Sequence, residues 1–374
     1  MLDVADLVFV DPAETGFSRI LPHAGRAAFY STAGDAKSVA QFIETWTRAN
    51  GRASSPKYLF GESYGTIRAV LVADELSRTT PVDGVVLFGQ AVNIVETVQR
   101  SGNITGYATN LPALAAIAAY HRLIDLKGRT VRELIDEAYA FGMSDYLLAL
   151  AKGRDLSAPE RTRIATRLAE LTGLTTEYYL ANGLVISKER FRSEILKNRG
   201  LIVGQYDARY TGPAPPPGER ATDPSMKMAP AFTALAVEYF TKTLGVTLPE
   251  EYRPQDSSAS SWDWSVPPSP FSDYDWPASI ARVMKAQPDF RLMIGTGIYD
   301  TTTTIGPARY LVARVGFPDE RVAMRDYDGG HMAYTNEAAL KALTDDVRAF
   351  LQPPQVEVVQ TAVSNCAADG RRLR

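Results

Sequence analysis

Residues 57–66 read K-Y-L-F-G-E-S-Y-G-T, and this stretch decides which fold the chain can adopt. The β-forming run at 58–60 meets a G-x-S-x-G motif at 61–65, and apolar residues at helical spacing follow from Ile67. A strand, a tight turn and a helix in direct succession are the context in which this motif forms a nucleophile elbow. We therefore expect Ser63 to occupy a strained turn, with its hydroxyl exposed at the edge of a sheet.

Steric reasons explain the two glycines of the motif. A turn this tight leaves little room beside the serine, so we predict that a Cβ atom at Gly61 or at Gly65 would clash. The amide of Tyr64 then points toward the negative oxygen that develops during acyl transfer, and the N-terminus of the following helix reinforces it. Tyr64 is the predicted first donor of an oxyanion hole.

Length and composition exclude several classes of function. The chain has 374 residues, is 45% hydrophobic and carries a formal charge of -3, so it can bury a large core and shows no basic footprint for nucleic acid. One cysteine, Cys366, allows neither an internal disulfide nor a cysteine zinc site. No stretch approaches the ~20 apolar residues that span a bilayer, and the acidic start is not typical of a signal peptide. We expect no cofactor, no metal and no membrane partner.

Apolar runs and helical periodicity alternate near the start of the chain. The continuous apolar run at 7–10 predicts a buried strand, the pattern at 35–50 predicts a helix, and 82–88 predicts another strand. With the elbow strand and its helix, this order predicts an α/β fold with a mostly parallel sheet. The loop at 11–18 would then lie at the carboxyl edge of the sheet, where such sheets bind ligands.

A long, mostly helical segment interrupts this alternation from residue 93 to residue 287. Sheet-forming runs return at 290–295 and 321–327, and an amphipathic helix follows at 337–350. A helical insertion of this size after a central strand is typical of a cap over an α/β active site. The predicted organisation is an α/β-hydrolase core at 1–92 and 288–353, a large helical cap insertion at 93–287 and a disordered tail at 354–374.

Three histidines are the candidates for a catalytic base. His23 lies in a polar loop, where a solvated side chain is expected, and His121 falls inside the helical segment, where a structural role is expected. His331 differs because it follows the last predicted strand in a Gly-Gly-His turn. In an α/β-hydrolase the order is serine, acid, histidine, with the histidine after the last strand, so the pattern favours His331.

Four aspartates could orient that histidine. Asp300 follows a predicted strand and precedes a helix, whereas Asp326 falls within the last strand, Asp328 lies only three residues before the histidine, and Asp319 is a loop residue. Because each member of a triad occupies the end of a different strand, the rule favours Asp300 and leaves the other three as alternatives.

These candidates define an acyl-transfer mechanism. Ser63 would attack an acyl carbon, His331 would take its proton and return it to the leaving group, and Asp300 would orient the imidazolium. A second oxyanion donor normally comes from a glycine-rich loop after an earlier strand.

Several segments, in this order, resemble the serine carboxypeptidase family and above all its bacterial members. G-E-S-Y-G at 61–65 is similar to the family's G-E-S-Y-[AG], and F-V-D-P-A-E-T-G-F-S-R at 9–19 is similar to its D-P-x-G-T-G-F-S loop. G-I-Y-D at 297–300 and Y-D-G-G-H-M-A-Y at 327–334 resemble its acid and histidine motifs. G-Q-Y-D-A-R-Y at 204–210 is similar to a segment of the bacterial cap.

This resemblance implies a serine-type carboxypeptidase that acts on peptide substrates through Ser63, Asp300 and His331. It also implies that Glu62 belongs to a network that holds the C-terminal carboxylate of the peptide. A glutamic acid that binds a carboxylate must be protonated, so binding should weaken as the pH rises and the optimum should be acidic. An acyltransferase or esterase on the same fold, and a catalytically weak binding protein, are the alternatives.

The chain also departs from the family pattern. The family's Asn-Gly-Gly-Pro-Gly segment, which supplies the second oxyanion donor and part of the carboxylate site, has no match here, and we interpret the chain as a shortened version of a longer protein that would be periplasmic or secreted. Glu14 replaces a glycine and should place a charge near the site, whereas Thr303 replaces a proline and should have little effect. Four aromatic residues are candidates for a specificity pocket: Trp262, Trp264, Phe271 and Tyr274.

Overall fold

A parallel β-sheet stands at the centre of the computed structural model, which describes residues 1–100, 102–247, 251–255, 262–265 and 274–352. Within these residues the sheet has four strands in the order β1 (Tyr58–Glu62), β2 (Gly84–Phe88), β5 (Arg291–Gly297) and β6 (Val322–Tyr327). Glu62 pairs with Phe88, and Phe88 pairs with Gly295, so the carboxyl ends of neighbouring strands meet at one edge. The α/β class with a parallel sheet is as predicted.

Helices cover both faces of this sheet because its central strands are apolar on both sides. In β2, Val85 and Leu87 contribute to one buried core, and Val86 and Phe88 contribute to another, as the alternation of side chains along a strand requires. The first core includes residues of α1 (Thr32–Ala49), α2 (Tyr64–Leu76), α11 (Trp276–Ala286) and α12 (Ile305–Val315). The second includes residues of α13 (Glu337–Leu351).

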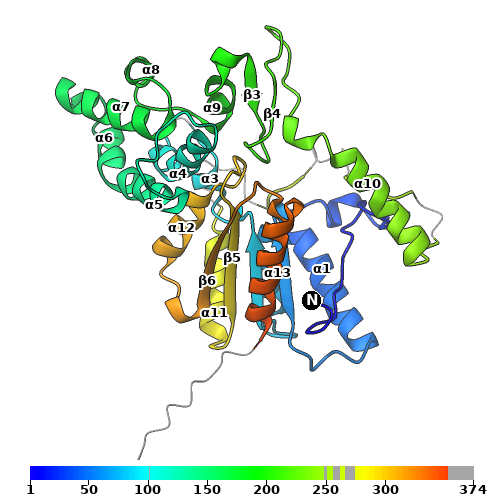
Figure 1. The fold of residues 1–374 in the computed structure, drawn as a ribbon. Coiled ribbons are helices and arrows are strands. Elements are labelled where there is room, and N and C mark those ends of the chain that lie inside the picture. Colours follow the sequence, from blue (N-terminus) through cyan, green and yellow to red (C-terminus); the bar gives the residue numbers. More distant parts are fainter. Residues whose placement is uncertain (101, 248–250, 256–261, 266–273, 353–374) are drawn as a thin grey trace, which may run out of the picture.

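A helical cap separates β2 from β5 along the chain and lies above the carboxyl ends of the strands (Figure 1). Its helices are α3 (Ile94–Thr97), α4 (Ile104–Tyr120), α5 (Val131–Phe141), α6 (Leu147–Lys152), α7 (Ala158–Thr172), α8 (Thr176–Ala181) and α9 (Lys188–Glu194). The alanine-rich helix α4 is buried between its neighbours, and this gives the cap a hydrophobic core of its own. The chain thus has an α/β architecture in which a helical cap covers one edge of a parallel sheet.

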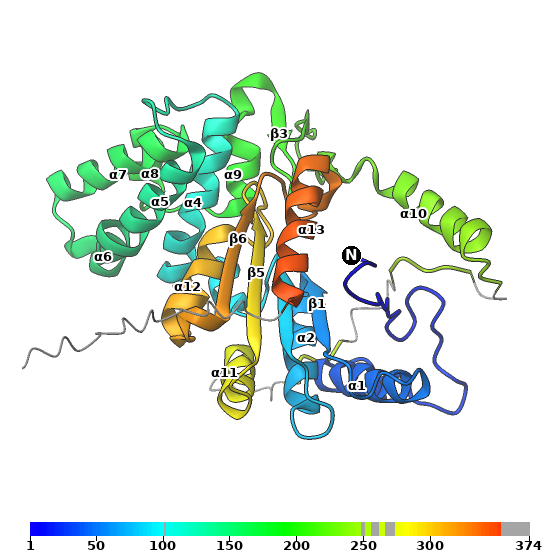
Figure 2. The same cartoon turned by 60° about the horizontal axis from the view of Figure 1, so that its bottom comes forward.

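Two features of the region between β2 and β5, a hairpin and helix α11 (Trp276–Ala286), differ from the sequence-based expectation. A hairpin of β3 (Leu201–Val203) and β4 (Thr211–Pro213) was not predicted, because strands of three residues are too short to show a period. Helix α11 lies within the predicted cap range, yet it packs on α2 and belongs to the core. Helix α10 (Ala229–Glu238) buries no residue and stands away from the sheet (Figure 2).

The strand predicted at residues 7–10 does not form. Leu7 is 44% exposed, Val8 is 42% exposed and Phe9 is 89% exposed. An apolar run becomes a strand only where another strand offers hydrogen bonds, and in the described chain this run pairs with none of the sheet's strands. The expectation of a buried strand here was wrong.

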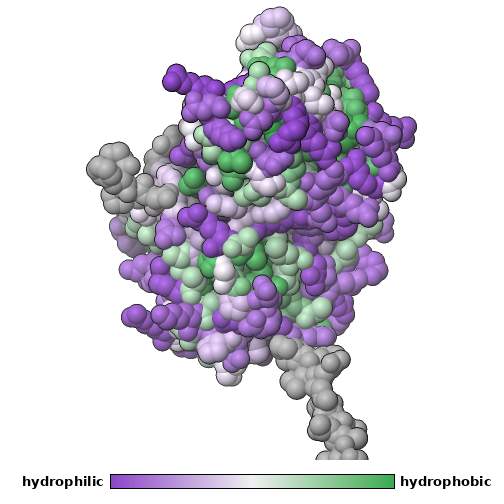
Figure 3. Space-filling model, turned by 90° about the vertical axis from the view of Figure 1, so that its left-hand side faces the viewer, coloured by the Kyte–Doolittle hydropathy of each residue, from purple (hydrophilic) through white to green (hydrophobic). Residues whose placement is uncertain are grey.

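The outer side of the cap is largely hydrophilic, with smaller hydrophobic areas between the polar side chains (Figure 3). Among the described residues, no helix combines the length and apolar character that a bilayer-spanning helix needs. The predicted tail at 354–374, together with Cys366, lies outside the described residues.

Candidate active site

Ser63 connects β1 directly to α2 and has a strained backbone. Its φ is 55° and its ψ is -123°, a conformation that residues with a side chain rarely adopt. The Ser63 amide donates a hydrogen bond to the Phe88 carbonyl at 3.0 Å, and the Thr66 amide and hydroxyl donate to the Ser63 carbonyl at 2.9 and 2.6 Å. These bonds on both sides hold the serine in a nucleophile-elbow geometry.

The two glycines of the motif have different roles. A Cβ atom on Gly61 would lie 2.1 Å from the Gly65 carbonyl oxygen, so only glycine fits there. A Cβ atom on Gly65 would meet no atom within 4 Å. The predicted clash is therefore right for Gly61 and wrong for Gly65, because the start of α2 turns this position toward open space.

Asp300 and His331 lie together in the loops that follow β5 and β6. The carboxylate Oδ2 lies 2.7 Å from the imidazole Nδ1, and the two residues are 0% and 3% exposed. Gly297 allows the loops to approach, because a Cβ atom there would lie 1.9 Å from the Gly330 carbonyl oxygen. The histidine's second nitrogen, Nε2, remains the one that can serve a nucleophile.

Two of the three alternative acids form ion pairs with arginines. Asp326 forms ion pairs with Arg309 at 3.3 Å and with Arg132 at 3.5 Å. Asp328 pairs with Arg209 at 3.5 Å. His121, the expected structural histidine, lies 2.7 Å from the Ala208 carbonyl through its Nε2.

A loop of threonines surrounds the Asp300 carboxylate. The amides of Thr302 and Thr303 donate to Oδ1 at 2.5 and 3.2 Å, and the Thr303 hydroxyl donates to Oδ2 at 2.7 Å. The same hydroxyl lies 3.1 Å from His331 Nδ1. Thr303, which we expected to have little effect, is therefore part of the hydrogen-bond network that orients the histidine.

The cap covers His331. The His331 amide donates to the Tyr206 carbonyl at 2.5 Å, and the two rings lie 5.4 Å apart between centroids. Burial lowers the pKa of His331, but the charge and hydrogen bond of Asp300, together with the charge of Glu62, outweigh burial and raise the pKa above its usual range. The cap and the core thus form the histidine environment jointly.

Gly89 brings the serine and the histidine into one neighbourhood. It follows Phe88, whose carbonyl binds the Ser63 amide, and a Cβ atom on Gly89 would lie 3.1 Å from the His331 ring. Among the described residues no hydrogen bond joins Ser63 Oγ to His331. Such bonds are often long without substrate and shorten in the substrate complex.

Glu62 ends β1 immediately before the serine. Its two carboxylate oxygens accept hydrogen bonds from the Tyr334 hydroxyl at 3.1 and 2.9 Å. Burial raises the pKa of Glu62 most; the Tyr334 hydrogen bond and the charge of His331 lower it, the charge of Asp300 raises it, and the net shift is upward. Sequence reasoning did not find Tyr334 as its partner, although the residue lies in the quoted histidine motif.

The backbone and the side chain of Tyr64 lie in different environments. It is the first residue of α2, where the backbone N–H group has no intrahelical acceptor and lies at the positive end of the helix dipole. Its hydroxyl donates to Asp35 Oδ2 at 3.0 Å, and Arg68 pairs with the same oxygen at 2.7 Å. The amide is available for an oxyanion, while the side chain anchors the helix to α1.

The candidate specificity aromatics pack on Tyr64. The ring centroids of Trp262 and Trp264 lie 5.2 and 6.0 Å from that of Tyr64, and Tyr274 lies 6.2 Å from Trp264. Phe271 lies outside the described residues. The proposed pocket-lining role of these residues stays a prediction.

The loop at 11–18 is attached to the region around Arg253. The Gly16 amide donates to the Arg253 carbonyl at 2.7 Å, and Glu14 forms an ion pair with the Arg253 side chain at 2.8 Å. The charge of Glu14 is therefore balanced. Among the described residues upstream of β1, none makes a hydrogen bond with Ser63.

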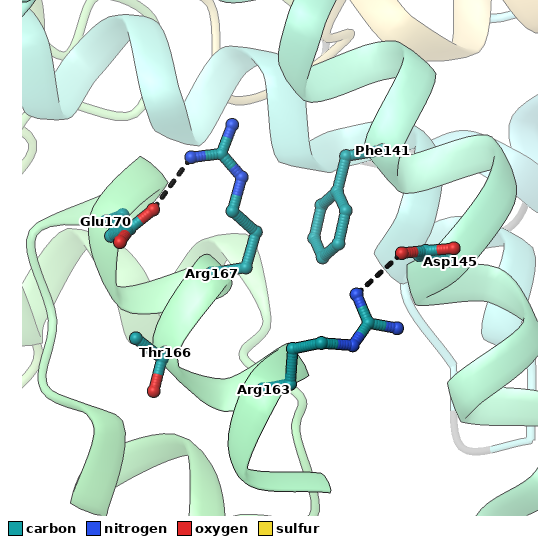
Figure 4. A pocket seen from close by; sticks show the side chains of 6 residues that line it. All are labelled: Phe141, Asp145, Arg163, Thr166, Arg167 and Glu170. Atoms are coloured by element: carbon teal, nitrogen blue, oxygen red, sulfur yellow. Dashed lines mark hydrogen bonds and ion pairs between the residues drawn. The ribbon is translucent and has the colours of Figure 1, made fainter. Parts of the chain in front are cut away.

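A hollow of about 410 Å³ lies in the cap between α5 and α7 (Figure 4). Arg163 pairs with Asp145 at 2.7 Å and Arg167 pairs with Glu170 at 2.8 Å, so the charges around it are balanced. None of its lining residues belongs to the candidate triad. Within the described chain, no group of three or more histidine, cysteine, aspartate or glutamate residues is placed to hold a metal ion.

Comparisons with known proteins add little to this picture. No protein-family model and no curated protein matches the chain. One solved structure that matches is the crystal structure of a highly thermostable carboxyl esterase from Bacillus coagulans in complex with glycerol. It shares 13% identity, with 87% of this chain and 76% of that chain covered and a TM-score of 0.33. A likeness at this level says nothing about activity.

Proposed function

We propose that this protein is a serine-type carboxypeptidase, which hydrolyses C-terminal peptide bonds through Ser63, His331 and Asp300. The half-buried carboxyl group of Glu62, one residue before Ser63, carries this proposal. Among the described residues it forms no ion pair, and its oxygens accept only from Tyr334. A carboxyl group of raised pKa beside a nucleophile is suited to share a proton with a substrate carboxylate.

The geometry supports a defined sequence of bond changes. Ser63 Oγ attacks the last peptide carbonyl while His331 Nε2 takes its proton, and the Tyr64 amide receives the oxyanion. His331 then gives the proton to the leaving amine, and an acyl-enzyme remains. Water attacks the acyl-enzyme by the same steps and releases the shortened peptide. The Asp300 carboxylate orients the imidazole throughout.

Two ionisations set the expected pH dependence. Glu62 must carry a proton to bind the substrate carboxylate, so activity on peptide acids falls as the pH rises through the raised pKa of Glu62. His331 must be neutral to act as a base, so activity also falls as the pH drops through the raised pKa of His331. The two groups interact, so the profile reports apparent values of the pair.

The decisive experiment compares an N-blocked dipeptide acid with its C-terminal amide, measuring kcat/KM between about pH 4 and pH 8. We expect the acid to be preferred at low pH and the preference to disappear as the pH rises. Glu62→Gln should abolish this pH-dependent preference and retain cleavage of a neutral ester. Equal cleavage of acid and amide at low pH would reject carboxypeptidase specificity and favour the esterase alternative.

Fluorophosphonate labelling tests the nucleophile separately. We expect an adduct on Ser63, located by peptide mass spectrometry, that is lost in Ser63→Ala and in His331→Ala. A folded protein without an adduct would reject the proposed catalytic role of Ser63 and leave a binding protein as the better description.

A further inference from the structure

Lys188, the first residue of α9, is a buried lysine that the reaction above does not use. It is 4% exposed, and its Nζ donates hydrogen bonds to the carbonyls of Thr97 and Thr302, both at 2.7 Å. Its amide donates to Gln99 Oε1 at 2.5 Å. Within the described residues, Lys188 forms no ion pair, and an ammonium group in such a place is costly unless its surroundings compensate it.

The two carbonyls connect the cap to the acid loop. Thr97 ends α3, the first helix after strand β2, and Thr302 belongs to the loop around Asp300. Thr302 accepts from Lys188 with its carbonyl and donates to Asp300 Oδ1 with its amide at 2.5 Å. A single residue therefore stands between the buried ammonium and the carboxylate that orients His331.

Charges from several elements face this lysine. Burial lowers its pKa to about 8, Asp300 and Glu189 oppose that change, and Arg192 adds to it. Lys188 is therefore a cation at neutral and acidic pH. The groups that face His331 are Asp300 and Glu62, which favour its protonation, and Lys188, which disfavours it.

We propose that Lys188 is a positioning residue of the triad: its buried ammonium group fixes the loop that carries Asp300 and places a positive charge close to the acid. The proposal rests on the proposed function only in taking Ser63, His331 and Asp300 as the reacting groups. Through this side chain the cap holds the loop that carries Asp300. The ammonium charge disfavours protonation of His331, so the imidazole stays neutral at lower pH than it otherwise would.

The test compares Lys188→Met, which removes the charge, with Lys188→Arg, which keeps it. Lys197→Met is the matched control, because Lys197 is 68% exposed and pairs with Glu194. The readouts are the pH dependence of Ser63 phosphonylation and the NMR titration of the His331 imidazole. In Lys188→Met we expect the midpoints of Ser63 phosphonylation and of the His331 titration to rise by about 0.5–1 pH unit. In Lys188→Arg and in Lys197→Met both midpoints should stay at the wild-type values.

A folded Lys188→Met protein with an unmoved His331 titration would overturn the proposal. If that variant does not fold, the reciprocal experiment decides, because coupling between two sites acts in both directions. Asp300→Asn should lower the titration midpoint of the Lys188 ¹⁵Nζ signal further below about 8, and an unchanged midpoint would overturn the proposal. Neither NMR readout uses a peptide substrate, so loss of carboxypeptidase specificity alone would leave this result intact.

Discussion

The two flanks of the sheet differ in how completely the described chain builds them. On the β5–β6 flank, Asp300 and His331 are 0% and 3% exposed, and the cap residue Tyr206 covers the histidine. On the β1 flank, Phe60 is 51% exposed and the apolar Phe9 is 89% exposed. The acid and histidine are enclosed on all sides, whereas the strand that carries the serine lies at an open edge.

The acid and histidine on one flank and the serine on the other are therefore held in place by different physical means. The acid and histidine depend on exclusion of water, which strengthens the hydrogen bonds and charges around them. The serine depends on backbone strain, held by the bonds of Ser63 to Phe88 and Thr66. Strain of this kind is local, so it persists beside an open edge.

The largest effect is expected on the enclosed flank. Asp300→Asn should lower kcat/KM about 10⁴-fold, because the amide stabilises the wrong imidazole tautomer. Asp328→Asn is the control: this residue is 76% exposed on its side chain, and its loss should change the rate by less than about twofold. Hydrolysis of an activated ester provides the measurement, and equal losses in both variants would contradict the assignment of Asp300.

At the elbow, the two glycines provide a paired test. Gly61→Ala should destabilise the protein by about 3 kcal/mol or more, since its Cβ would lie 2.1 Å from a backbone oxygen. Gly65→Ala should be neutral or stabilising by up to about 1 kcal/mol, since the new methyl enters open space and alanine favours a helix. Urea unfolding measures the stability of both variants. A large loss of stability in Gly65→Ala would show that the turn has no room for a methyl group at this position.

A smaller effect is expected where the two flanks meet, at the contact between Tyr334 and Glu62. Removing the hydroxyl in Tyr334→Phe deletes a hydrogen bond that lowers the pKa of Glu62, so this pKa should rise further. The preference for peptide acids should then extend to higher pH by about 0.5–1 unit. Tyr327→Phe, whose hydroxyl donates to Asp346 at 2.9 Å, should leave the pH profile unchanged. If the two variants had the same pH profile, Tyr334 would have no role in carboxylate binding.

The smallest effect is expected at the open flank. Phe9→Ser should change the free energy of unfolding by less than about 0.5 kcal/mol, because the side chain is already in water. Phe88→Ala, at a fully buried position of the neighbouring strand, should cost about 3–5 kcal/mol. Thermal and urea unfolding compare the two, and a comparable cost for Phe9→Ser would show that residues 7–10 pack against another surface in solution.

Motif order was sufficient to select residues that the fold brings together. Ser63, Asp300 and His331 were chosen because each follows a predicted strand, and parallel strands place their carboxyl ends at one edge. The same reasoning failed at residues 7–10, because an apolar run carries no information about whether a partner strand exists. It also underestimated Thr303, because the replacement of a proline does not show that the new hydroxyl reaches both Asp300 and His331.

By itself, the amino-acid sequence determined the strand-turn-helix around Ser63, the helical cap and the order of the candidate triad, because periodicity and turn sterics are local properties. Only the tertiary structure decided that Lys188 reaches the Asp300 loop, that Tyr334 binds Glu62 and that Phe9 stays in water. Burial and charge at these residues depend on segments far apart in the chain, and the packing of cap on core sets those distances. Local pattern therefore specifies which groups can react, and packing sets their ionisation and solvent exposure.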